Sequence, residues 1–136
     1  MLNKILSSPG LRALGSAVAG FIGYGAWAWL ANMNHGGEMA LRAALTQGTY
    51  SFVITLILTG LMEWLFSRLI GWPKRRRFLG STIPVCLLLY LSSYSVNYLA
   101  GTPNILLTIL PGAILSTLYA FSYIGALAKI EKKIDE

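Results

Sequence analysis

A stretch of 51 residues without one charged side chain runs from Phe78 to Ala128, and it limits how this chain can fold. A soluble domain of 136 residues does not bury so much uncharged sequence in one core. Two membrane-spanning helices and a short turn account for it, because a spanning helix needs about 20 apolar residues. Composition agrees, since 55% of the residues are hydrophobic and only 12% are charged.

Extended to the whole chain, this reasoning predicts an all-α integral membrane protein with four transmembrane helices in a single domain. We expect the helices at residues 11–33, 38–70, 78–99 and 103–128, with a short charged cytoplasmic tail at 129–136. Pro111-Gly112 is expected to break helix four near the middle of the membrane. The uncharged run from Ala13 to Asn34 exceeds the roughly 7–15 residues of a signal core, so we expect the first helix to be retained.

Lysine and arginine are divided unevenly between the two sides of this predicted topology. Of the 11 in the chain, all but Arg42 fall on the side that holds both termini and the loop between helices two and three. The positive-inside rule therefore predicts that both termini are cytoplasmic. We expect the membrane to be a bacterial inner membrane. Three spans after signal cleavage would leave the basic loop on the same side.

A polar ridge follows the second predicted helix at steps of four residues. Its members are Gln47, Ser51, Thr55, Thr59 and Glu63. Polar side chains in lipid gain by facing another helix, so the ridge either forms interhelical hydrogen bonds or lines a polar path. Each step drifts by about 40° around the helix, so the two ends of the ridge need not face the same neighbour. Glu63 is the best functional candidate, because ionisable groups within spans often mark pathways; the alternative is a position at headgroup level.

A second set of polar and helix-breaking residues falls in the outer parts of helices three and four. We expect it to line an outward-facing cavity formed by Tyr90, Ser93, Tyr94, Asn97, Pro111 and Gly112. Broken helices expose backbone groups that transporters use to bind substrates. A proline kink within an ordinary packed bundle is the competing interpretation.

Small residues four apart on the first helix, Gly15, Ala19 and Gly23, predict close helix packing. They indicate packing within this bundle or, alternatively, a surface for a second subunit.

The basic cluster Lys74, Arg75, Arg76 and Arg77 is first a signal of topology. It also predicts contact with anionic lipid headgroups, worth about 1 kcal/mol for each basic residue, or with an acidic protein partner. No aromatic platform for nucleic acid accompanies it.

Catalytic chemistry is not indicated. The chain has one His, one Cys and five acidic residues, and no nucleophile–base set, metal-ligand cluster or phosphate-binding loop is evident. We therefore expect no enzyme activity, no cofactor and no metal site; an enzyme acting on lipids remains a distant alternative.

In size, helix number and orientation the chain is similar to the small GtrA-type membrane proteins, which are implicated in moving polyprenyl-linked sugars. The stretch Gly10 to Asn32 resembles their glycine-rich first helix, and the basic stretch before helix three falls in the expected place. Lys74 to Phe78 lacks the Asn-Arg-aromatic pattern of that loop, so the resemblance assigns no functional residues.

Two functions follow as hypotheses. The first is a small accessory or scaffolding subunit of an envelope-assembly or lipid-handling complex, with a protein partner. The second is a small oligomeric transporter or flippase for a lipid-linked or amphipathic substrate.

Overall fold

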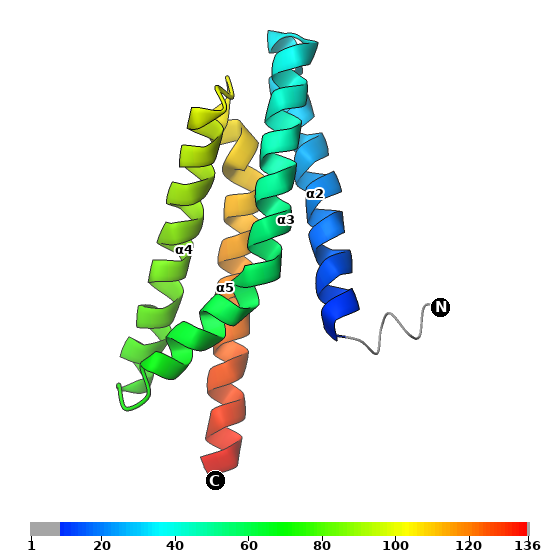
Figure 1. Ribbon diagram of the computed structural model, residues 1–136. Coiled ribbons are helices and arrows are strands. Elements are labelled where there is room, and N and C mark those ends of the chain that lie inside the picture. Colours follow the sequence, from blue (N-terminus) through cyan, green and yellow to red (C-terminus); the bar gives the residue numbers. More distant parts are fainter. Residues whose placement is uncertain (1–8, 136) are drawn as a thin grey trace.

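The computed structural model describes residues 9–135. Lys4, which entered the count of basic residues, and Glu136 at the end of the tail lie outside the described residues. The elements in chain order are α2 (Pro9–Asn32), the 3-10 turn η1 (Met33–His35), α3 (Gly37–Arg68), α4 (Lys74–Leu99) and α5 (Ile105–Asp135) (Figure 1). Within this part of the chain, four helices are long and apolar enough to cross a membrane, which confirms the all-helical fold class.

The helices alternate in direction, so their connections gather at two ends of the bundle (Figure 1). One end holds the start of α2, the α3–α4 connection and the end of α5; we call it the basic end, because Lys74, Arg75 and Arg76 lie there. The opposite end, which we call the far end, holds η1 and the α4–α5 connection.

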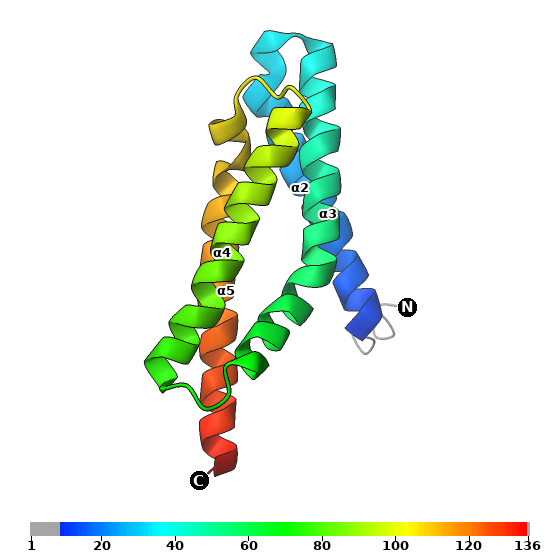
Figure 2. The same cartoon turned by 60° about the vertical axis from the view of Figure 1, so that its left-hand side comes forward.

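Helix α3 changes neighbours along its length. Its first half lies against α2, and its second half bends away from α2 toward the lower part of α4 (Figures 1 and 2). Thr55 Oγ1 donates a hydrogen bond to the carbonyl of Ser51 at 2.6 Å, a contact that tends to bend helices, and Gly60 follows five residues later. The start of α2 is consequently separated from the other three helices at the basic end (Figure 2).

The apolar core near the basic end is built without α2. Its buried members include Met62 and Phe66 of α3, Val85 and Leu89 of α4, and Ile124 of α5. Large apolar side chains also cover the outside of the bundle; Leu91 is 67% exposed and Leu106 is 72% exposed. An apolar exterior of this kind is stable in lipid rather than in water.

Helix α5 is continuous across Pro111-Gly112, where the sequence led us to expect a break. Proline has no N–H, so Pro111 leaves the carbonyl of Leu107, four residues earlier, without its helical partner. The indole Nε1 of Trp27 donates a hydrogen bond to that carbonyl at 2.9 Å. A side chain of α2 therefore replaces the missing hydrogen bond, and the helix continues.

Helix α4 begins earlier than the sequence indicated. The basic cluster was expected in a loop before residue 78, but Lys74–Arg77 form the first turn of α4, directly after Pro73. The N–H of Arg77 donates to the carbonyl of Pro73 at 2.9 Å, which closes this turn.

Candidate functional site

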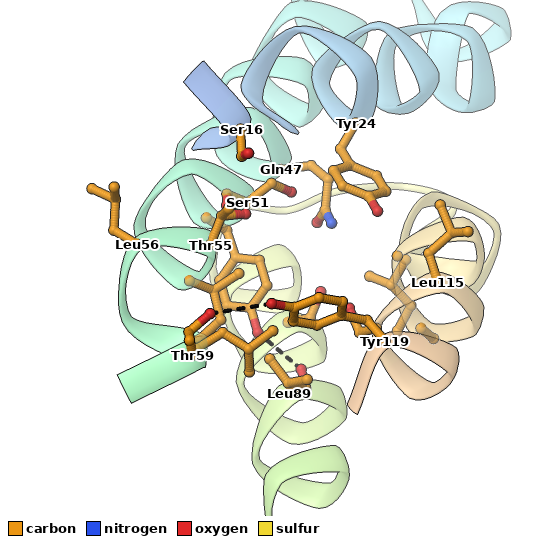
Figure 3. A pocket seen from close by; sticks show the side chains of 18 of the residues that line it. Ser16, Tyr24, Gln47, Ser51, Thr55, Leu56, Thr59, Leu89, Leu115 and Tyr119 are labelled. Atoms are coloured by element: carbon orange, nitrogen blue, oxygen red, sulfur yellow. Dashed lines mark hydrogen bonds between the residues drawn. The ribbon is translucent and has the colours of Figure 1, made fainter. Parts of the chain in front are cut away.

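A cavity of about 700 Å³ lies among the four helices, and each of them contributes side chains to its wall (Figure 3). Hydroxyl groups dominate its polar surface, and among the described residues Arg12 of α2 is the only charged one that lines it. The hydroxyl-bearing residues are Ser16, Tyr24, Tyr50, Ser51, Thr55, Thr59, Tyr90, Ser93, Ser116, Tyr119 and Tyr123. Apolar side chains, among them Ile54, Leu89 and Ile109, complete the wall, so the cavity is amphipathic.

Four of the five residues of the α3 polar ridge line this cavity: Gln47, Ser51, Thr55 and Thr59 (Figure 3). Gln47 also accepts a hydrogen bond from Nδ2 of Asn97 on α4 at 2.7 Å, and the hydroxyls of Thr59 and Tyr119 of α5 are 3.2 Å apart. The ridge therefore combines both interpretations of the sequence, because some of its groups bond other helices while the ridge also faces a cavity.

Glu63, the last residue of the ridge, is exposed and lies outside the cavity wall. Its carboxylate accepts a hydrogen bond from the hydroxyl of Tyr123, which does line the cavity. The two ends of the ridge thus face different neighbours: Gln47 faces α4, and Glu63 faces α5.

The structure divides the residues that were predicted to form an outer cavity. Tyr90, Ser93 and Gly112 line the central cavity, and Pro111 lines an adjacent groove. Asn97 is fully buried beyond the cavity, where it bonds other polar groups. Tyr94 is 43% exposed and stacks on Tyr98 outside the bundle, so it belongs to the exterior.

Two buried polar networks lock the far end. In one, Oδ1 of Asn97 accepts from the hydroxyl of Thr102 at 3.0 Å while its Nδ2 donates to Gln47. In the other, Nδ2 of Asn32 donates to the Thr108 hydroxyl at 2.8 Å, and the backbone N–H of Asn104 donates to Oδ1 of Asn32 at 2.9 Å. These networks tie α2, α3, α4 and α5 together at one end, whereas α2 stands apart at the other.

The four residues of the basic cluster differ in exposure to solvent. Arg77 is turned inward: its Nε donates to the carbonyl of Phe66 at 2.9 Å, its guanidinium lies 3.7 Å from the centre of the Phe66 ring, and it pairs with Glu131. Lys74, Arg75 and Arg76 are exposed. Only these three are therefore placed to meet headgroups or a partner, while Arg77 connects α3, α4 and α5.

The small residues predicted to pack within the bundle lie on another face of α2. A Cβ at Gly15 or Gly23 would meet nothing within 4 Å. The close approach of α2 to α3 is made instead at Gly25 and Gly48, where added Cβ atoms would lie 3.1 Å from the Ala44 carbonyl oxygen and 3.0 Å from the Phe21 carbonyl oxygen. Helix α2 contains many small residues, and their spacing in the sequence did not reveal which of them face α3.

Part of the cavity wall was missed in the sequence. On α5, the predicted Gly112 is followed by three hydroxyl-bearing wall residues that were not predicted, Ser116, Tyr119 and Tyr123, at spacings of four, three and four, which is a helical face that sequence inspection could have found. Arg12 was counted only as a topology signal.

No known protein family, curated protein or solved structure matched this chain when it was compared with each of these sets. The described residues contain no group of three or more His, Cys, Asp or Glu side chains that could hold a metal ion. The chemistry that the site offers is hydrogen bonding by hydroxyls and an amide, with one cation at its edge.

Proposed function

We propose that this chain is an integral protein of a bacterial inner membrane, with both ends of the described chain and the α3–α4 connection on the cytoplasmic side. The exposed side chains of Lys74, Arg75 and Arg76 at the basic end support this orientation. Anionic headgroups of the cytoplasmic leaflet would meet the same three residues.

We propose that the chain binds an amphipathic, lipid-type molecule in its central cavity and transfers it between leaflets, without catalysis. The observation that carries this proposal is the amphipathic cavity of about 700 Å³ among helices that are long enough to span a bilayer. Polar groups within the hydrocarbon region are costly unless they have partners. A hydroxyl-lined cavity within the hydrocarbon region suits the polar part of an amphiphile, whose apolar part would stay in lipid.

The transfer proposal is tested with a substitution that fills the cavity from α5. Ser116 lines the cavity, whereas Ser122 on the same helix is exposed and lines neither hollow, so Ser116→Leu and Ser122→Leu form a matched pair. The purified protein is reconstituted in vesicles that contain a fluorescently labelled phospholipid. A membrane-impermeant reductant quenches the label in the outer leaflet, and the further loss of fluorescence gives the rate of transfer from the inner leaflet.

We expect Ser116→Leu to slow transfer by about tenfold, equivalent to about 1.4 kcal/mol of barrier, and Ser122→Leu to leave the rate unchanged. Wild-type protein that transfers no faster than protein-free vesicles, or equal rates for the two variants, would contradict the proposal.

A second candidate function is an accessory or scaffolding subunit of an envelope-assembly or lipid-handling complex. It is favoured by the exposed basic turn of α4 and by the small-residue face of α2, which none of the described helices covers at Gly15. Native mass spectrometry of the protein taken from its own membrane distinguishes the two. A different protein bound in fixed ratio supports the subunit, and a homo-oligomer that retains lipid supports the carrier.

A further inference from the structure

A groove of about 510 Å³ lies beside the central cavity, between α2 and α5. It shares wall residues with the cavity from three helices, namely Ser16 and Tyr24 of α2, Thr55 of α3 and Leu115 of α5. The two hollows therefore adjoin each other at these four residues.

Small residues of α2 create this groove. Ala19, Gly20 and Gly23 line it, and a Cβ at Gly23 would meet nothing within 4 Å. At Gly20, an added Cβ would lie 3.5 Å from Oγ1 of Thr55, a residue that lines both the groove and the cavity, so a larger side chain there would fill the space where the two adjoin. The opening exists because these positions carry almost no side chain.

The depth of the groove in the membrane determines whether it faces the hydrocarbon core or the lipid headgroups. Gly20 lies near the middle of α2, which runs from Pro9 to Asn32, so in a spanning orientation the groove faces the hydrocarbon core. Arg12 lies eight residues nearer the basic end than Gly20, about 12 Å along the helix axis. A hydrocarbon-facing groove thus adjoins a hydroxyl-lined cavity that has the guanidinium of Arg12 in its wall.

We infer that the α2–α5 groove admits and holds the hydrocarbon tail of an anionic phospholipid-type amphiphile, whose head lies in the cavity with its negative group toward Arg12. This inference rests on the proposed function and adds the side of entry and the charge of the ligand. Within residues 9–135, Arg12 is the only charged residue of the cavity wall, and the carboxylate of Glu63 lies outside that wall and accepts from Tyr123. The charge of the site therefore favours an anion over a cation.

The test is lipid titration of the purified full chain in detergent, followed by native mass spectrometry, with phosphatidylglycerol and phosphatidylcholine as probes. Gly23→Leu places a side chain in the groove, and Ala19→Leu does the same one turn away. Gly15→Leu is the matched control, because Gly15 is on the same helix, has equally open surroundings and lines neither hollow.

We expect wild-type protein to bind one phosphatidylglycerol about tenfold more tightly than phosphatidylcholine, a difference of about 1.4 kcal/mol. Gly23→Leu and Ala19→Leu should weaken phosphatidylglycerol binding by about tenfold, Gly15→Leu should not change it, and Arg12→Gln should remove the preference for the anionic lipid. Unchanged unfolding temperatures of the variants would show that the fold is retained.

Three results would overturn the inference. Equal binding of both lipids by wild type would remove the charge preference, and unchanged binding in Gly23→Leu and Ala19→Leu would remove the groove. Loss of a dimer in both Gly15→Leu and Gly23→Leu, with lipid binding intact, would assign this face to a second copy of the chain. In each case a slowed transfer rate for Ser116→Leu would leave the proposed function standing, so the two failures are distinguishable.

Discussion

At the scale of single residues, buried amides determine how the far end holds together. Asn97 is fully buried and bonds three groups: Nδ2 donates to Gln47 and to the Ser93 carbonyl, and Oδ1 accepts from Thr102. One side chain of α4 thereby fixes α3 and the α4–α5 connection. The described buried side chains leave no polar atom without a hydrogen-bond partner, as the apolar surroundings require.

Replacement of Asn97 by Ala should destabilise the protein by about 1–3 kcal/mol, because Gln47 and Thr102 would keep buried polar groups without partners. The exposed Ser95, which bonds only a carbonyl of its own helix, provides the control; Ser95→Ala should cost less than about 0.5 kcal/mol. Reversible unfolding in mixed detergent micelles measures both values. Equal stability of the two variants would show that the network contributes little.

At the scale of helices, one arginine connects α3, α4 and α5 at the basic end. Arg77 of α4 reaches the Phe66 carbonyl of α3 and the Glu131 carboxylate of α5, and it does so at the end where α2 gives no support. The sequence placed Arg77 among four equivalent basic residues, and only the packing of α3 and α5 around it distinguishes it from its neighbours.

Arg77→Met should loosen the end of α5 and lower the free energy of unfolding by about 1–3 kcal/mol. This is less than a fully buried ion pair would lose, since the side chain of Glu131 is 43% exposed. Arg75→Met, at an exposed position of the same turn, should have no such effect. Amide hydrogen exchange across residues 125–134 reports the loosening, and equal exchange in the two variants would contradict this role.

At the scale of the whole molecule, buried polar networks hold the helices together at the far end, whereas α2 is separate from the other three helices at the basic end. A polar network joins α2 to α5 and to the α4–α5 connection near η1, while the bend of α3 moves its second half away from α2 (Figure 2). This asymmetry places the cavity and the groove where they are. It also places the head of the proposed ligand near the basic end, where Arg12 lies.

Reporter fusions test the orientation of the chain in the membrane. An alkaline phosphatase fused after Trp72 or after Glu136 should be inactive, because alkaline phosphatase folds only on the outer side of the inner membrane. Fusions after Gly36 and after Gly101, both in far-end connections, should be active. Activity after Trp72 or Glu136 would reverse the topology.

The sequence by itself determined the fold class and the approximate positions of the four long apolar helices, since uncharged runs of sufficient length are a direct requirement of the bilayer. It also identified Gln47, Ser51, Thr55, Thr59 and Glu63 as one ridge, and all of these except Glu63 line the cavity. Helical spacing is a local property, so these features need no knowledge of the neighbours.

Only the tertiary structure decided which faces meet. In a membrane protein, lipid-facing and partner-facing positions are both apolar, so the pattern that separates inside from outside in a soluble helix is lost. For this reason the sequence could not show that Gly25 and Gly48 make the close contact while Gly15 and Gly23 do not, or that Arg77 turns inward. The continuity of α5 was equally hidden, because the hydrogen bond that replaces the one Pro111 lacks comes from Trp27, a residue 80 positions from its acceptor.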